Sequence, residues 1–218
     1  MSVYGCYTTI PQRLNFTSAI NSFLRQTLPI QTVYISMPRN IHNNSGENYY
    51  TPNIHHERLR VLKTPYDFGP ATKVLGCYKY VPDNSYLFVI DDDIEYLPDL
   101  LETLYAYNQP VVSFSTCSAA SLGGICGFEG YLIKKKYLNG IENFYNTLPK
   151  ECLYVDDIWL GLYFNYTGTP VRYIKSLKHS IFTRVQSWKS TLFDSQSLSH
   201  KTLSHTKKNE ICFDLLKK

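Results

Sequence analysis

The 218-residue sequence lacks the marks of a membrane or exported protein. No stretch approaches the roughly 18 consecutive apolar residues that a membrane-spanning helix needs. The N-terminus has no charged region followed by an apolar run, which a signal peptide would show. We therefore expect a protein without membrane insertion, located in the cytoplasm (the host cytoplasm if the protein is viral).

The sequence also lacks paired cysteines. Its six cysteines form no C-x-x-C motif, which argues against a zinc site. Because they are scattered along the chain, we expect reduced, mostly buried thiols in a reducing compartment. These residues are Cys6, Cys77, Cys117, Cys126, Cys152 and Cys212.

The excess of positive over negative charge is also small. The formal net charge is +4, and the basic residues are scattered apart from 134–136 and the C-terminal lysines. A duplex usually calls for a stronger basic stripe. The balance favours a small anionic ligand and no nucleic acid.

What the sequence does have is an alternation of β-rich and helical segments. Strands are predicted at 3–8, 32–36, 59–62, 86–90, 111–115, 131–133 and 171–174. Helical patterns separate most of them, including one that begins at Asp156-Asp157 and ends at Gly168. Alternating strands and helices predict an α/β fold with a mostly parallel, Rossmann-like central sheet. With 44% hydrophobic residues, one large domain is expected.

The most informative feature is an acidic corner after a buried strand. Five apolar or aromatic residues, 86–90, are followed by Asp91, Asp92 and Asp93. Burying three adjacent charges would cost several kcal/mol per charge, so the corner must lie at the open end of the sheet. In an extended chain Asp91 and Asp93 point the same way and can share one hard cation. A solvated turn is the alternative reading.

Three other constellations follow predicted strands or begin helices. Thr8, Thr9 and Arg13 come directly after the first strand, where hydroxyls can reach a nucleoside and the guanidinium can bind an anion. In the segment 67–73, Lys73 would oppose the helix dipole unless an anion sits at the helix end. Asp156-Asp157 begins a helix, where acids are favourable without any function but could also supply a general base.

In this order the motifs T-T-I-P-x-R, D-F-G-P-A-T-K, D-D-D, a glycine-rich stretch and V-D-D-I-W-L resemble the GT-A glycosyltransferases. The resemblance covers about residues 3 to 175 and is closest to small enzymes of large algal DNA viruses. It implies a DxD motif that holds Mn²⁺ or Mg²⁺, a UDP-sugar donor, and a glycan or glycoprotein acceptor.

The resemblance also assigns residues. The implied metal ligands are Asp91, Asp93 and, as third ligand, His179. The implied base is Asp157, with Asp156 as second choice, which would permit inversion at the anomeric carbon. The implied substrate-binding residues are Thr8, Thr9, Arg13, Asp67, Gly69, Lys73, Asp92, Gly124 and Gly127.

The predicted organisation is a single domain, residues 1–218. Residues 1–115 form a nucleotide-binding half, 116–180 an acceptor and catalytic half, and 181–218 a lid loop with a C-terminal helix. The sequence is also compatible with one module of a longer protein.

Two other functions fit the same acidic pairs. One is a metal-dependent nucleotidyltransferase, although the phosphate-binding run G-x-x-x-x-G-K-[ST] is absent from the sequence. The other is a non-catalytic module that binds a nucleotide sugar or glycan. The presence of an acid at position 157 favours the transferase.

Overall fold

A computed structural model describes residues 1–9, 17–38, 55–92, 94–115, 118–175, 182–184 and 205–217. Its centre is a seven-stranded sheet with the order β3-β2-β1-β4-β7-β6-β8. The strands are β1 (Val3–Thr8), β2 (Thr32–Pro38), β3 (Leu59–Thr64), β4 (Tyr86–Val89), β6 (Val111–Phe114), β7 (Tyr131–Lys134) and β8 (Val171–Ile174).

The sheet is mostly parallel, as the sequence predicted. β1 pairs in parallel with both β2 and β4, β2 with β3, and β6 with β8. β7 alone among the seven runs antiparallel to its neighbours β4 and β6. Since β1 and β4 are parallel neighbours, the residues that follow them meet at one edge of the sheet.

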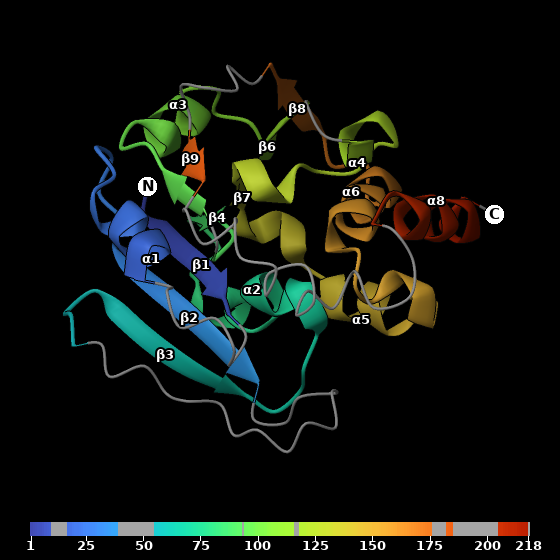
Figure 1. Cartoon of the computed structure of the whole chain (residues 1–218), viewed down its shortest axis with the longest axis horizontal. Helices are drawn as coiled ribbons and strands as arrows, with labels where there is room; N and C mark the ends of the chain where they lie inside the picture. The colour runs from blue at the N-terminus through green and yellow to red at the C-terminus, as the bar shows by residue number, and fades with distance from the viewer. Residues whose placement is uncertain are drawn as a thin grey trace.

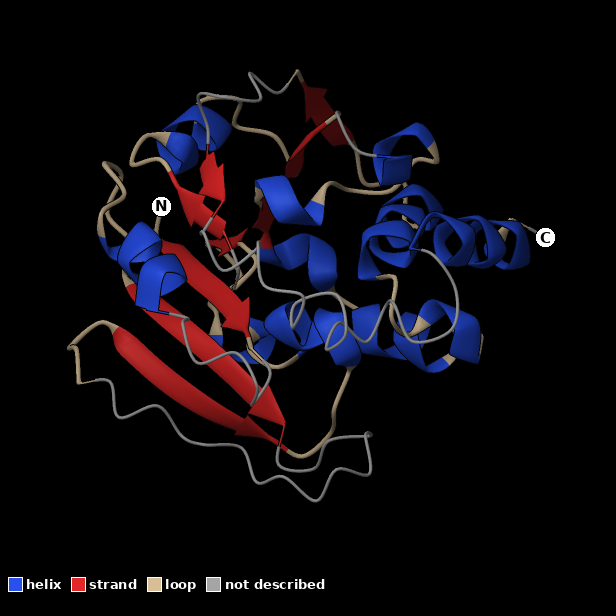
Figure 2. Ribbon diagram, viewed as in Figure 1, coloured by secondary structure: helices blue, strands red, loops and turns tan. Residues whose placement is uncertain are grey.

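Helices cover both faces of the sheet (Figure 2). They are α1 (Thr17–Leu24), α2 (Thr72–Leu75), α3 (Leu100–Tyr105), α4 (Ser118–Ser121), α5 (Ile141–Asn146), α6 (Asp156–Tyr166) and α8 (His205–Leu216). In Figure 1, α5, α6 and α8 gather on the side of the molecule away from β3.

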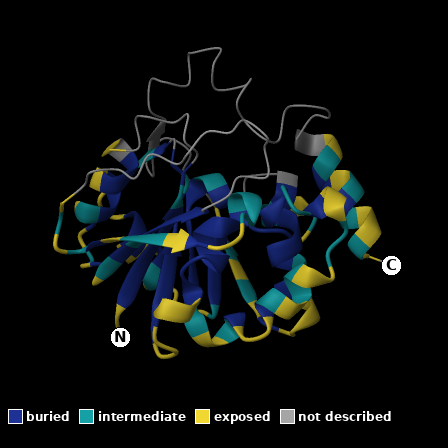
Figure 3. Ribbon diagram, turned by 90° about the horizontal axis from the view of Figure 1, so that it is seen from below, coloured by how far each residue is buried: buried dark blue, intermediate teal, exposed yellow. Residues whose placement is uncertain are grey.

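Two hydrophobic cores result, one on each face. Alternate residues of β4 separate between them: Leu87 and Val89 pack with α2 and α6, whereas Tyr86 and Phe88 pack with α1 and α3. All four are buried, as Figure 3 shows for the strands generally. A strand covered on both faces reads as a continuous apolar run, which is why this one was predictable.

The expectation of reduced thiols is wrong for three of the described cysteines. Cys152 and Cys212 form a disulfide whose Cα atoms lie 4.9 Å apart, and Cys126 is also disulfide-bonded. Cys6 and Cys77 are free and buried. The first bridge joins the 3₁₀ turn η5 (Lys150–Cys152) to α8. Because its cysteines are 60 residues apart, spacing gave no signal of the pairing.

A second, two-stranded sheet was not predicted. β5 (Ile94–Tyr96) pairs antiparallel with β9 (Phe182–Arg184). β5 follows the acidic corner, and β9 belongs to the segment predicted as a lid. The rest of that loop, 185–200, lies outside the described residues. No described helix is both long enough and apolar enough to span a bilayer.

Candidate functional site

The acidic corner lies at the shared edge of β1 and β4. Asp92 is 7% exposed, and its Oδ2 accepts a hydrogen bond of 2.8 Å from the Thr9 hydroxyl. The side chain of Asp91 is 30% exposed. The two adjacent acids therefore differ: Asp92 anchors the corner to the end of β1, and Asp91 faces the open edge.

Lys73 connects this corner to a second acidic pair. Its Nζ lies 2.8 Å from Asp91 Oδ1 and 3.1 Å from Asp156 Oδ2. The second contact has a geometry unsuited to a hydrogen bond. The lysine is only 4% exposed, and taking an ammonium out of water costs several kcal/mol unless such partners offset it. One cation thus holds carboxylates from β4 and α6 together.

Burial by itself would lower the pKa of Lys73. The carboxylates of Asp156 and then Asp91 act the other way and raise this pKa well above its ordinary value. The ammonium therefore stays charged. The sequence predicted an anion near Lys73; the structure gives it two carboxylates.

The second acidic pair begins α6. Asp156 is buried and paired with Lys73, whereas Asp157 is partly exposed. Burial, and then the Asp156 carboxylate, raise the pKa of Asp157 well above its ordinary value. The ammonium of Lys73 and a hydrogen bond from the Gly127 N–H oppose that rise. A carboxylate whose pKa is raised is a stronger base and hence a better proton acceptor.

The glycine-rich segment packs against α6. A Cβ at Gly124 would lie 2.5 Å from the Asp157 carbonyl oxygen, and one at Gly127 would lie 2.3 Å from Asp157 Oδ1. The Ile125 N–H donates a 2.8 Å hydrogen bond to the same carbonyl. Both glycines were predicted to approach a sugar. The structure gives them a packing reason, which is to leave room for Asp157.

Three predicted substrate-binding residues make local contacts. The Thr8 hydroxyl donates to the Ser36 carbonyl at 2.8 Å. The Gly69 N–H donates to Asp67 Oδ1 at 2.8 Å, and Gly69 has a φ of +59°, which favours glycine. Asp67 is also near the second half of the chain, because after burial it is the next cause raising the pKa of Tyr145 to about 12.

Of the predicted metal ligands, the structure describes Asp91. Arg13, Asp93 and His179 lie outside the described residues. Within the described ranges, no group of three or more His, Cys, Asp or Glu residues could hold a metal ion. Asp91 does fit a ligand of a hard cation, because it is a partly exposed carboxylate that meets Lys73 through Oδ1.

Two tyrosines near the site were missed. The Tyr96 hydroxyl accepts a hydrogen bond from the Asp91 N–H at 3.1 Å and donates one to the Phe128 carbonyl at 2.9 Å. The Tyr131 hydroxyl is buried near Lys73 without a hydrogen-bond partner among the described residues. Both side chains reach the site by sheet pairing or a turn, which residue types alone do not reveal.

No protein-family model matches the chain, and no curated protein matches its sequence. Solved structures do match. S. aureus TarS, residues 1–349, aligns with a TM-score of 0.56 at 11% identity, covering 97% of this chain and 69% of that one. M. tuberculosis glucosyl-3-phosphoglycerate synthase with Mn²⁺, UDP-glucose and phosphoglycerate aligns with a TM-score of 0.56 at 12% identity, covering 96% and 80%.

Two other matches bear on the fold. A Pyrobaculum calidifontis mannosyltransferase in complex with GDP-mannose and Mn²⁺ aligns with a TM-score of 0.55 at 12% identity, covering 82% of this chain and 55% of that one. Francisella tularensis 2-C-methyl-D-erythritol 4-phosphate cytidylyltransferase aligns at 0.51 with 10% identity, covering 91% and 100%. The chain spans only 37% of the longer TarS structure. The protein has the GT-A fold.

Proposed function

We propose that the protein is a glycosyltransferase that moves a sugar from a UDP-sugar to a hydroxyl acceptor on a glycan or glycoprotein. The observation that carries this proposal is the pair of contacts from Lys73 to Asp91 and Asp156. They bring a carboxylate at the end of β4 and the acids at the start of α6 to one edge of a GT-A sheet, where ligands of α/β folds bind.

The donor is proposed from the structural neighbours. TarS is described in complex with UDP, and the phosphoglycerate synthase with Mn²⁺ and UDP-glucose. The mannosyltransferase was solved with a GDP-sugar instead. A nucleoside diphosphate group is common to the three complexes, and uracil is the more frequent base.

A divalent ion, Mn²⁺ or Mg²⁺, is part of the proposal. Asp91 and Asp93 would hold it, with His179 as the proposed third ligand. When bound, such an ion supplies positive charge for the diphosphate oxygens of the leaving group. Thr8, Thr9, Arg13, Asp67 and Asp92 remain the proposed contacts around the nucleotide.

Asp157 is the proposed general base. Asp157 is more exposed than Asp156, which is buried and paired with Lys73. The Gly127 N–H orients the Asp157 carboxylate, and a raised pKa suits proton removal from an acceptor hydroxyl. A base placed opposite the leaving group would give inversion of the anomeric centre, with Asp156 as the second choice.

Lys73 has a different proposed role from the one first predicted. The sequence suggested direct contact with the diphosphate. Its low exposure and its two ion pairs favour action through Asp91 and Asp156. The ammonium neutralises their charges and holds them in place while the ligand binds.

The direct test is a screen of nucleotide sugars with Mn²⁺. We expect a UDP-sugar to raise the melting temperature, and mass spectrometry to detect UDP release that Asp157→Asn slows by about 10²- to 10⁴-fold. A screen in which neither UDP- nor GDP-sugars bind would refute the proposal.

A nucleotidyltransferase is the second candidate. The cytidylyltransferase neighbour is matched over 100% of its length, and such enzymes also use acidic residues around a divalent ion. Release of pyrophosphate from a nucleoside triphosphate, with no turnover of nucleotide sugars, would identify this activity. Ligand binding with no turnover of either would indicate a non-catalytic module.

The compartment and the viral resemblance stay predictions. The disulfide between Cys152 and Cys212 weighs against the predicted cytoplasmic location, because disulfides are rare in reducing compartments. None of the structural matches above is described as viral.

A further inference from the structure

We infer that Tyr96 is a positioning residue that fixes the spacing between the Asp91 corner and the carboxylate of Asp157. This inference rests on the proposed glycosyl transfer, because it assigns those two groups to opposite sides of the reacting centre. It concerns a residue that touches neither substrate nor metal and acts only through other groups.

The phenol of Tyr96 joins two backbone segments. Its hydroxyl accepts from the Asp91 N–H at 3.1 Å and donates to the Phe128 carbonyl at 2.9 Å. Tyr96 is 2% exposed, so water cannot readily replace either bond. Without the hydroxyl, one backbone donor and one backbone acceptor would lose their partner inside the protein.

The bond from Tyr96 to the Phe128 carbonyl reaches the turn that orients the proposed base. Phe128 lies in the 3₁₀ turn η3 (Gly127–Glu129), and the N–H of Gly127 in the same turn donates to Asp157. The Gly130 N–H closes the turn on the Gly127 carbonyl at 3.0 Å. A displacement of the Phe128 carbonyl would therefore move the donor that holds Asp157.

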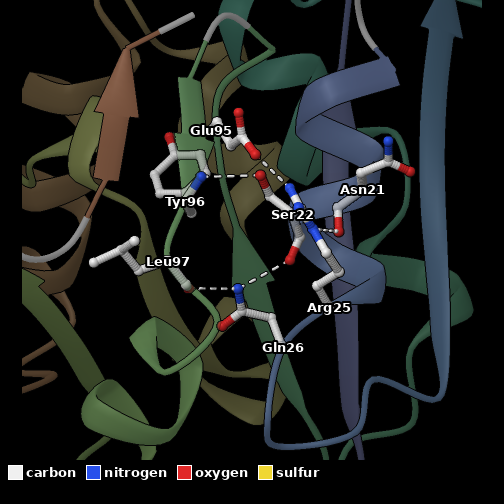
Figure 4. A network of polar contacts seen from close by, with 7 residues as sticks. All are labelled: Asn21, Ser22, Arg25, Gln26, Glu95, Tyr96 and Leu97. Carbon is white, nitrogen blue, oxygen red and sulfur yellow. Dashed lines mark hydrogen bonds and ion pairs between the residues drawn. The ribbon is translucent and has the colours of Figure 1, made fainter.

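The backbone at Tyr96 is held in place by α1 and the residues that follow it. The Tyr96 N–H donates to Ser22 Oγ at 2.9 Å, and Gln26 Nε2 donates to the Leu97 carbonyl at 2.9 Å (Figure 4). Gln26 Oε1 also accepts from the Leu101 N–H at 2.8 Å. Arg25 pairs with Glu95 on the exposed side. A side chain fixed at its own backbone can hold other groups at a fixed distance.

Tyr96 thus provides a second link across the site. The first is ionic, through Lys73 from Asp91 to Asp156. The second is neutral, through Tyr96 from the Asp91 backbone to the turn beside Asp157. Two links at different atoms restrict both separation and rotation, and a misplacement of about 1 Å at a reacting group can cost about 100-fold in rate.

The test is Tyr96→Phe, with Tyr163→Phe as matched control. Tyr163 is also a buried tyrosine whose hydroxyl lies on two backbone carbonyls, those of Tyr137 at 3.1 Å and Asn139 at 2.8 Å. Tyr163 lies in α6, away from the acidic residues that begin this helix. Both variants should lose similar thermal stability, which controls for the general cost of a lost buried hydroxyl.

We expect Tyr96→Phe to lower kcat by about 10- to 100-fold while KM for the donor sugar changes little. Tyr163→Phe should keep wild-type kcat. Equal kcat in both variants would overturn the inference. If the wild-type protein turned over no nucleotide sugar, that result would refute the proposed function without testing the role of Tyr96. A second readout then tests the role of Tyr96.

That readout is the ¹³C NMR titration of the Asp157 carboxyl group, which needs no substrate. Loosening the Gly127 N–H should move the Asp157 midpoint upward in Tyr96→Phe and leave it unchanged in Tyr163→Phe. An unchanged midpoint in both variants contradicts the inference. If Tyr96→Phe does not fold, Ser22→Ala removes the acceptor of the Tyr96 N–H and should shift the Asp157 midpoint in the same direction. An unchanged midpoint in Ser22→Ala would likewise contradict the inference.

Discussion

The two acidic pairs of the site have matching partners but opposite exposure. In each pair one carboxylate contacts Lys73 and the other is held by a neutral donor, the Thr9 hydroxyl for Asp92 and the Gly127 N–H for Asp157. At the end of β4 the lysine-bound member, Asp91, is the more exposed one. At the start of α6 the lysine-bound member is buried and its neighbour Asp157 is more open.

This difference indicates a division of roles. A carboxylate that faces the open edge while its second oxygen pairs with Lys73 suits a ligand for a cation. Burial, and then a neighbouring carboxylate, raise the pKa of Asp157, which suits proton transfer. The residue types are identical, so the surroundings alone create the distinction.

The largest effect is expected from Asp157→Asn. The variant keeps an oxygen for the Gly127 N–H but cannot accept a proton, so turnover should fall by about 10²- to 10⁴-fold. The control is Asp83→Asn, whose side chain is 67% exposed and pairs with Lys135 away from the site. Initial rates of UDP release measure both. Near wild-type turnover in Asp157→Asn would contradict the assignment of Asp157 as the general base.

The next effect concerns the cation that joins the pairs. Lys73→Met leaves the Asp91 and Asp156 carboxylates without their partner, and breaking a buried ion pair on one side costs about 3 kcal/mol of unfolding free energy. Lys79→Met is the control, because Lys79 is 61% exposed and pairs with Glu142 on the surface, a contact typically below about 1 kcal/mol. Urea denaturation compares them. Equal losses would mean that Lys73 is not the buried bridge described above.

A third prediction concerns how firmly each acidic pair is attached to the rest of the fold. The disulfide between Cys152 and Cys212 ties the turn preceding α6 to α8, whereas the described part of the β4 corner has no such covalent tie. Replacing both cysteines with serine should lower the unfolding free energy by about 2–4 kcal/mol. Amide exchange should rise near Asp156 more than near Asp91. Uniform exchange at both pairs would contradict this difference in anchoring.

The smallest effect is in the pH dependence of stability. The pKa of Asp157 is raised in the folded state, so its stabilising contribution is full below its unfolded pKa and is lost as pH rises through the folded pKa. The Asp157→Asn variant has no titrating carboxyl group at this position, so it does not lose this stability as pH rises. The variant should therefore gain stability relative to wild type as pH rises from about 4 to neutrality, by about 1.4 kcal/mol for each unit of pKa shift. A gain at acid pH instead would reverse the sign and refute the assignment.

Much of the fold could be predicted because burial leaves a mark in the sequence. The β4 strand is apolar throughout since both of its faces are covered, and it stops at Asp91 because the sheet edge begins there. The helix at Asp156 was predictable from its acidic first turn and from the glycine that follows its end. That the two acidic pairs belong to one site was implied only by the resemblance to GT-A glycosyltransferases.

The parts that escaped prediction depend on contacts between distant segments. The Cys152–Cys212 bridge joins residues 60 positions apart, and β5 pairs with β9 across a still longer gap in the chain. The low exposure of Lys73 could not be read either, because its partners come from different elements. The hydroxyl of Tyr96 acts on backbone groups, which carry no residue-specific signal.

The most direct test of the central assignment is the anomalous diffraction of Mn²⁺ in crystals grown with UDP. The assignment predicts an anomalous peak about 2 Å from a carboxylate oxygen of Asp91, next to the UDP diphosphate. A UDP-bound crystal with no peak at Asp91, or with the ion held elsewhere, would contradict it.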